Sequence, residues 1–197
     1  MDDYNKYAQA IKDSICSIYS KKIKGWIIDL RLNPGGNMWP MLGGIGLIIG
    51  DGKVGSFVNS KGEMEHIWSI KGGDAYNDTN RFTFSICRCA SKHKNLKVAV
   101  LIGPLTQSSG EAIAIALEGR PDTKFFGENT GGYTTANLTH ELMYNFSLLV
   151  ASFIEADRHK NLYRHMVKPD ILLEGGDNFI ELNKDTKVIT ALNWLKK

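Results

Sequence analysis

The segment from Val98 to Leu117 constrains the fold more than any other part of the chain. It begins with five apolar residues, Val98–Ile102, which predict a buried strand. A Gly-Pro pair ends that strand, and an apolar helix is expected from Ser109 to Glu118. Ser108 lies where this helix starts, beside unpaired backbone N–H groups and the positive end of the helix dipole. The segment therefore predicts a strand, a turn and a helix, with a serine at the turn.

The position of Ser108 has two interpretations. Ser108 and Glu111 have the spacing of a capping box, in which the serine only caps the helix. A helix start also supplies fixed donors for the oxyanion that forms when a hydroxyl attacks a carbonyl. Taken alone, the motif favours capping, because such spacings are common in helices without chemistry.

Strand and helix patterns alternate along the 197 residues. The pattern predicts helices over 3–22, 39–49 and 185–196, strands over 25–31, 81–87, 98–102 and 124–127, a hairpin of 53–59 with 64–71, a polar loop over 71–80, and a β-pair of 142–145 with 148–153. This alternation favours an α/β fold with a mixed, mostly parallel sheet, flanking helices and room for an antiparallel edge. No linker or internal repeat divides the chain, so we expect a single domain over residues 1–197.

Composition excludes several classes of function. The net charge is +3 with lysines interleaved among acids, so nucleic acid is not an expected partner. Cys16, Cys87 and Cys89 are an odd number without metal-ligand spacing, and we interpret them as reduced structural thiols. The five histidines are dispersed, so neither a metal nor another cofactor is expected. The sequence contains no signal peptide or transmembrane span, which leaves the localisation open.

Three segments in order resemble the signature motifs of one enzyme family. Residues 25–36 read GWIIDLRLNPGG, residues 106–111 read TQSSGE, and residues 127–132 read GENTGG. Together they resemble the C-terminal processing (tail-specific) and tricorn-core serine peptidases. The sequence GGYTTAN at 131–137 is most similar to the nisin-resistance branch, whose members are usually extracytoplasmic or membrane-anchored.

The resemblance implies a ClpP/crotonase-like core and a role for each matching residue. Ser108 corresponds to the nucleophile. The implied oxyanion hole consists of the backbone N–H groups of Ser109, Gly35 and Gly36. The implied supporting residues are Glu111, Glu128 and Thr130. The substrate would be a peptide or protein, bound by the enzyme as an added strand.

The general base is where this chain departs from the family pattern. Many tail-specific peptidases have a lysine 25 residues after the serine, and Tyr133 occupies that position here. The other branches take a histidine from upstream of the strand over 25–31, and here only one helix precedes that strand. We therefore expect a family domain truncated at its N-terminus, with the base a histidine outside this chain. His140 and His66 are the candidates within it.

These expectations lead to three hypotheses about function. The first is a serine endopeptidase core that forms an acyl-enzyme on Ser108. The alternative is a catalytically inactive peptide-binding or vestigial scaffold of the same fold. A weaker third is a crotonase-like acyl transferase. A truncated domain would also leave apolar surface uncovered, which predicts self-association.

Overall fold

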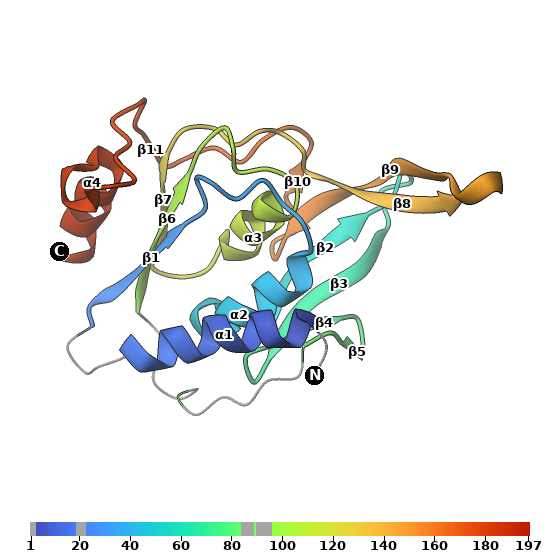
Figure 1. Ribbon diagram of the computed structural model, residues 1–197, viewed down its shortest axis with the longest axis horizontal. Coiled ribbons are helices and arrows are strands. Elements are labelled where there is room, and N and C mark those ends of the chain that lie inside the picture. The colour runs from blue at the N-terminus through green and yellow to red at the C-terminus, as the bar shows by residue number, and fades with distance from the viewer. Residues whose placement is uncertain (1–2, 19–22, 84–88, 90–95) are drawn as a thin grey trace.

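A four-stranded parallel sheet forms one layer of the computed structural model, which describes residues 3–18, 23–83, 89 and 96–197 (Figure 1). Its strands are β1 (Gly25–Asp29), β6 (Lys97–Ile102), β7 (Thr123–Gly127) and β11 (Ile171–Leu172), in the order β1-β6-β7-β11. The apolar segment 98–102 of β6 is completely buried, because both faces of this sheet are covered. The predicted parallel sheet with flanking helices is confirmed.

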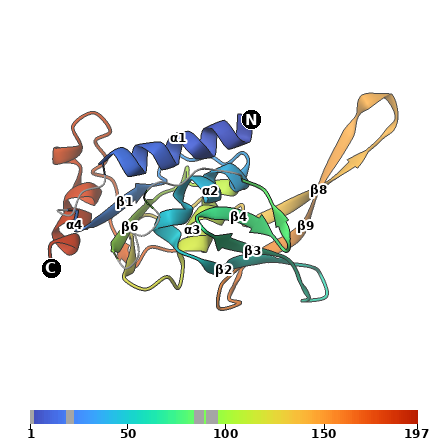
Figure 2. The ribbon, with the colours of Figure 1, turned by 90° about the horizontal axis from the view of Figure 1, so that it is seen from below.

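The helices cover the two faces of β6 unequally. Val98, Val100 and Ile102 belong to the main core, which they share with residues of α2 (Met38–Ile49) and α3 (Ser109–Leu117). Ala99 and Leu101 point the other way, into a smaller core under α4 (Thr186–Leu195). This alternation along one strand is the two-residue period of a β-strand. The helix α1 (Asp3–Ile18) packs on α2 at the outside (Figure 2).

A second, antiparallel sheet is larger than the antiparallel edge that the sequence allowed. It contains β10 (Leu162–Tyr163), β9 (Ser147–Asp157), β2 (Gly52–Val58), β3 (Met64–Lys71), β4 (Asp74–Asn77) and β5 (Asn80–Arg81), in that order, with β8 (Thr135–Glu141) paired to β9. The prediction of a polar loop over 71–80 is wrong, since β4 and β5 lie there. Their polar residues suggested a loop, but Asp74 of β4 is buried, where it pairs with Lys12. The predicted strand over 81–87 lies mostly outside the described residues.

The strands β8 and β9 form a hairpin that projects from the body of the molecule (Figure 1). Its tip is a short 3-10 turn, Met143–Asn145. The predicted pairing of 142–145 with 148–153 is therefore half wrong: the second strand lies within β9, but its partner is β8. The apolar residues Leu142, Met143 and Tyr144 suggested a strand, whereas they occupy the exposed end of the hairpin.

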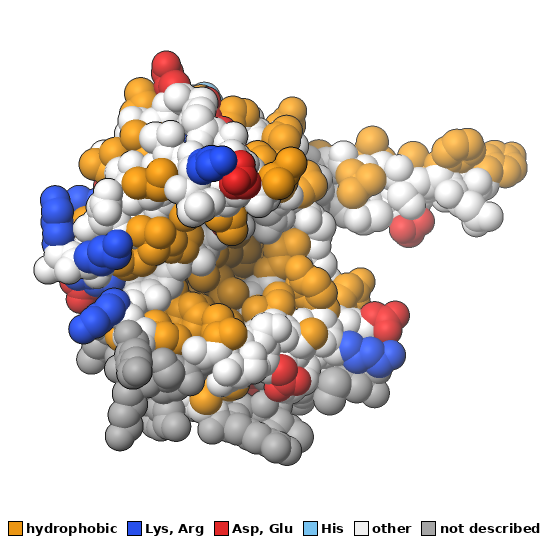
Figure 3. All heavy atoms as spheres, turned by 60° about the vertical axis from the view of Figure 1, so that its left-hand side comes forward, with side chains coloured by type: hydrophobic (Ala, Val, Ile, Leu, Met, Phe, Trp, Pro, Cys, Tyr) orange, Lys and Arg blue, Asp and Glu red, His pale blue; other side chains and the backbone are white. Residues whose placement is uncertain are grey.

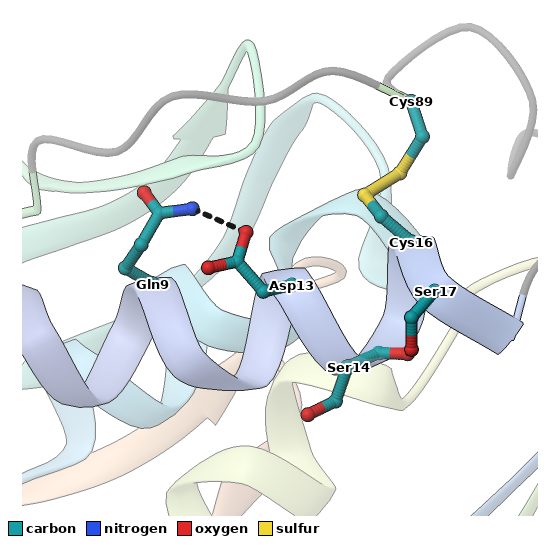
Figure 4. The surroundings of a disulfide bond; sticks show 6 residues. All are labelled: Gln9, Asp13, Ser14, Cys16, Ser17 and Cys89. Atoms are coloured by element: carbon teal, nitrogen blue, oxygen red, sulfur yellow. Dashed lines mark hydrogen bonds between the residues drawn. A yellow bond between two sulfur atoms is a disulfide. The ribbon is translucent and has the colours of Figure 1, made fainter.

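A disulfide joins Cys16 of α1 to Cys89 (Figure 4). The interpretation of these two cysteines as reduced thiols is wrong, because the fold brings their Cα atoms within 5.8 Å across a sequence separation of 73 residues. Cys87 lies outside the described residues. A buried ion pair of Lys12 with Asp74, 2.8 Å apart, also connects α1 to β4. Two long-range links therefore hold α1 on the body.

No helix among the described residues has the length and apolarity needed to cross a membrane.

The remaining short element is a 3-10 turn, Leu182–Lys184, just before α4. Asp185 caps α4 by accepting the N–H of Val188 at 2.9 Å.

Candidate active site

Ser108 lies in a tight loop between β6 and α3. Its backbone has φ of 50° and ψ of −120°, a region that residues other than glycine rarely adopt. Such strain costs about 1–3 kcal/mol and persists only where the surrounding structure enforces it. The loop therefore holds a half-buried serine in one fixed orientation at the start of the helix.

Thr106 fixes this loop to the sheet. Its buried hydroxyl donates to the carbonyl of Leu30 at 2.8 Å and accepts the N–H of Gly103 at 3.1 Å. The carbonyl of Thr106 accepts the N–H of Gly131 at 2.9 Å. One residue thus joins the segments that follow β1, β6 and β7. The sequence placed Thr106 in the TQSSGE motif without indicating this role.

Glu111 is completely buried and connects Ser108 to the loop that follows β7. Its carboxylate accepts the backbone N–H groups of Ser108 at 3.0 Å, Gly132 at 2.8 Å and Tyr133 at 2.7 Å. The hydroxyl of Thr130 donates to the same carboxylate. Hydrogen bonds to a charged acceptor are stronger than neutral ones. The structure thus brings Glu111 and Thr130, two predicted supporting residues, together beside the nucleophile position.

Gly35 packs directly against Ser108. A Cβ on Gly35 would lie 2.9 Å from the Cβ of Ser108, and the φ of Gly35 is +108°, so only glycine fits without strain. The N–H of Gly35 donates to the side-chain oxygen of Asn33 at 3.1 Å. The N–H of Gly35 therefore already has an acceptor, and the residue packs closely against Ser108.

The two other predicted donors, Ser109 and Gly36, lie on facing segments. The hydroxyl of Ser109 donates to the carbonyl of Gly36 at 2.7 Å, which ties the glycine turn to α3. In the part of the chain that the structure describes, the backbone N–H groups of both residues have no hydrogen-bond acceptor. An unpaired N–H is normal in the first turn of a helix. The N–H of Ser109, next to Ser108 in the chain, is therefore available to an oxyanion, and Gly36 lies on the turn that Ser109 binds.

Glu128, the third predicted supporting residue, is engaged elsewhere. Its carboxylate accepts a hydrogen bond from Lys187 of α4 at 2.6 Å, and Lys187 also binds Asp177 at 2.7 Å. Burial would lower the pKa of Lys187, but these two hydrogen bonds raise it above its ordinary value. Glu128 therefore joins the end of β7 to α4, and its carboxylate is bound to this lysine rather than to the serine.

Arg31 is the centre of the same ionic network. Its guanidinium donates to Asp29 at 2.9 Å and 2.6 Å, to Asp177 at 2.6 Å and to Asp185 at 2.7 Å. Burial acts to lower the pKa of Arg31, yet the hydrogen bonds to Asp29 and Asp185 raise it. The Asp-Leu-Arg motif thus anchors the C-terminal segment to the sheet. No local pattern indicates this role, because Asp177 and Asp185 lie about 150 residues from Arg31 in the chain.

Neither candidate histidine lies at this junction. His140 is on β8, one residue pair from the end of the hairpin, and is exposed. His66 is on β3, with its Nδ1 atom 3.7 Å from the carboxylate of Asp78. Within the described ranges, no histidine or lysine is hydrogen-bonded to Ser108. The described part of the chain contains no group of three or more His, Cys, Asp or Glu residues that could hold a metal ion.

Glu155 of β9 is a buried acid that the sequence analysis missed. It is 3% exposed, and its Oε2 atom has no hydrogen-bond partner among the described residues. Burial, followed by the charge of nearby Glu111, raises the pKa of Glu155 well above its ordinary value. Glu155 is therefore a second buried carboxyl group near Glu111. The sequence feature that could have indicated a buried acid is the single glutamate in the mostly apolar segment SLLVASFIEAD.

The fold and site define a mixed α/β protein of the S41 protease type. Residues 1–173 match the family model described as Peptidase family S41, and the chain belongs to this family. Membership supports a serine peptidase core.

Individual relatives agree with this assignment. The chain is 33% identical over 181 residues to the nisin-resistance protein of Lactococcus lactis subsp. lactis, covering 91% of this chain and 52% of that protein. It therefore spans about half the length of this curated relative. A lipoprotein structure from Streptococcus agalactiae is similar with a TM-score of 0.75 and 25% identity, over 100% of this chain and 62% of that one. The photosystem II D1 C-terminal processing protease shares the fold, with a TM-score of 0.68, 19% identity, and coverage of 86% and 39%.

Proposed function

We propose that this chain is the catalytic core of a serine endopeptidase in which Ser108 is the nucleophile. The observation that carries the proposal is the strained backbone of Ser108 at the start of α3, next to the unbonded N–H of Ser109 and packed against the glycine turn at Gly35. A nucleophile needs a fixed position, and an oxyanion needs donors that are already in place.

The reaction would proceed through an acyl-enzyme. The Oγ atom of Ser108 attacks the carbonyl carbon of a peptide bond while its proton passes to a general base. The carbonyl oxygen becomes negatively charged and accepts hydrogen bonds from Ser109 and Gly36. The C–N bond then breaks, and the leaving amine takes the proton from the base. Water, deprotonated by the same base, hydrolyses the ester and restores the serine.

We propose that the general base is a histidine outside this chain. Two observations support this. Among the described residues, no histidine is hydrogen-bonded to Ser108, and the chain spans 52% of the nisin-resistance protein that it resembles. Glu111 is not a substitute, because it is buried and accepts hydrogen bonds from four groups.

An inactive peptide-binding scaffold is the second candidate. It is favoured because no histidine or lysine among the described residues is hydrogen-bonded to Ser108. Incubation with an unfolded protein substrate, with and without added imidazole as an external base, separates the two. The endopeptidase predicts new peptide termini by mass spectrometry, more of them with imidazole, and none with Ser108→Ala. If the chain binds the substrate but does not cleave it, with or without imidazole, the chain is a peptide-binding scaffold and not a peptidase.

We also propose that the protein works outside the cytoplasm. The Cys16–Cys89 disulfide supports this, because disulfides persist in oxidising compartments. The similar Streptococcus agalactiae protein is described as a lipoprotein, which is consistent with the same location. Thiol labelling of the protein isolated from its source should modify both cysteines only after reduction. Labelling of both without a reductant would contradict the proposal.

A further inference from the structure

A small pocket opens at the carboxyl ends of the parallel strands, where the loops gather at the top of Figure 1. This end of the strands is where ligands bind in open α/β sheets. The pocket has a volume of about 130 Å³. We call it the edge pocket; it is lined by 31–32, 103–105, Glu128, Asp177, Phe179 and Lys187.

The loops that line the edge pocket also carry the proposed nucleophile and the glycine turn. Leu105 precedes Ser108 by three residues, and Leu32 lies on the loop that continues into the glycine turn. The two loops are bonded to each other, because the N–H of Gln107 donates to the carbonyl of Asn33 at 3.0 Å. Three residues of chain span at most about 11 Å, so the Cα atoms of Leu105 and Ser108 lie within that distance. About three residues of an extended peptide cover the same length.

The edge pocket and Ser108 lie on opposite sides of the sheet edge. The helix α3, which begins beside Ser108, packs in the main core on one face of the sheet. Lys187 of the pocket belongs to α4, which covers the other face. A peptide bound at Ser108 would reach the pocket by crossing the ends of the strands. The side chain that enters the pocket is therefore not the one at the scissile bond.

The exposed walls of the edge pocket are apolar. Leu32, Leu105 and Phe179 are 58%, 55% and 48% exposed. Figure 3 brings the side of the molecule that carries α4 forward and shows hydrophobic side chains at its surface. The guanidinium of Arg31 lies over the ring of Phe179, 4.6 Å from its centroid, which fixes this wall. An apolar cavity of about 150 Å³ can hold a benzene molecule, so the edge pocket has the size for one leucine or phenylalanine side chain.

The charged groups of the edge pocket are paired with one another. Arg31 donates to Asp177 at 2.6 Å. Lys187 donates to Asp177 at 2.7 Å and to Glu128 at 2.6 Å. Two cations and two anions therefore line the pocket, and their formal charges cancel. A charged substrate side chain would have to break one of these bonds or stay unpaired, which is unfavourable. The pocket thus favours an apolar side chain over lysine or glutamate.

We infer that the edge pocket is a specificity subsite, which binds one apolar side chain of the peptide substrate about three residues from the scissile bond. This inference rests on the proposed peptidase function of Ser108. The pocket lies on the loops that hold the nucleophile, has room for one side chain and has balanced charges. The substrate class is therefore a peptide with leucine, methionine or phenylalanine at that position. Burial of such a side chain should raise kcat/KM about tenfold over serine.

Cleavage of a mixture of unfolded proteins, with imidazole as the external base, tests the subsite. Mass spectrometry identifies the new termini and aligns the cleavage sites. We expect apolar residues to exceed serine about tenfold at one position, about three residues from the cleaved bond. Leu105→Lys places a positive charge on the pocket wall and should shift the preference there to aspartate and glutamate. Ile180→Lys is the matched control, since Ile180 is 95% exposed and does not line the pocket, and it should keep the apolar preference. Circular dichroism checks that both variants fold.

The outcomes separate the subsite from the peptidase. Cleavage without an apolar preference, or with one that Leu105→Lys changes no more than Ile180→Lys does, would overturn the subsite but not the role of Ser108. A preference for lysine or glutamate in the unmodified chain would overturn it as well.

If the unmodified chain cleaves nothing, the peptidase proposal fails and binding alone decides on the pocket. Fluorescence anisotropy is then measured with labelled glycine-serine octapeptides that carry a single leucine, lysine or glutamate. The leucine peptide should bind about tenfold more tightly than the other two, and Leu105→Lys should remove this difference. Equal binding of the three peptides would overturn the inference.

Discussion

The junction around Ser108 and the β8–β9 hairpin, whose residues 135–153 we call the arm, are neighbours in the chain but are built in opposite ways. The N–H of Tyr133 donates to Glu111, and β8 begins two residues later, at Thr135. At the junction, buried polar groups are paired across segments that follow three different strands. In the arm, apolar side chains are exposed and a strand edge is open. The difference teaches that the junction is organised by its own contacts, whereas the arm leaves its apolar side chains exposed.

Among the variants considered, Glu111→Ala should lower the free energy of unfolding most. The substitution removes the acceptor of the part-buried Ser108, Gly132 and Tyr133 N–H groups and of the buried Thr130 hydroxyl. We expect the free energy of unfolding to fall by about 4 kcal/mol. Urea denaturation measures it. Glu181→Ala is the control, because Glu181 forms only an exposed pair with Lys184 and its loss should cost less than about 0.5 kcal/mol. Equal effects of the two variants would contradict the account of the junction.

Gly35→Ala tests whether the glycine turn must approach Ser108 closely. A methyl group there meets the Ser108 Cβ at 2.9 Å, at a positive φ. We expect a loss of about 3 kcal/mol in unfolding free energy. Gly62 also has a positive φ, but a Cβ on it would have nothing within 4 Å. Gly62→Ala should therefore cost only about 1 kcal/mol, from backbone strain alone. The difference in unfolding free energy between the two variants measures the cost of the close contact with Ser108.

Glu118, at the other end of α3 from Ser108, should make the stability depend on pH. Burial, and then the charges of Asp170 and Asp157, raise its pKa to about 7. The folded protein therefore holds a proton that the unfolded chain releases at a lower pH. The stabilising effect is complete below the ordinary pKa near 4.5 and is lost as the pH rises through about 7. Glu118→Gln should remove about 2 kcal/mol of this decline between pH 4.5 and 8. An unchanged pH profile in that variant would show that Glu118 is not the group responsible.

Phe146→Ser should have the smallest effect on folding. Phe146 lies at the end of the arm and is 68% exposed. We expect the unfolding free energy to change by less than about 0.5 kcal/mol. A loss of several kcal/mol would mean that the arm packs on the body of the molecule, and would remove the contrast with the junction.

Local patterns predicted the centre of the fold and of the site. The strand over 98–102 and the helix after Ser108 could be predicted because five buried apolar residues, a Gly-Pro break and a capping box lie within one short segment. The close approach of Glu111 to Ser108 follows from their three-residue spacing in a helix.

Long-range contacts could not be predicted in this way. The Cys16–Cys89 disulfide spans 73 residues, and two of the acids that bind Arg31, Asp177 and Asp185, lie about 150 residues away from it. No local pattern encodes such distances. The prediction of a strand over 142–145 failed for a related reason, because apolar residues usually indicate burial and here they are exposed at the end of the arm.

Labelling with a fluorophosphonate probe tests the central claim, that this chain holds Ser108 ready for nucleophilic attack. The modified residue is identified by peptide mass spectrometry, with its neighbour Ser109 as an internal control. We predict selective modification of Ser108, about tenfold or more faster than that of Ser109, with a rate that rises when imidazole supplies the external base. Ser108→Ala should abolish it. Labelling of Ser108 no faster than in the urea-unfolded chain, with imidazole present, would contradict the account.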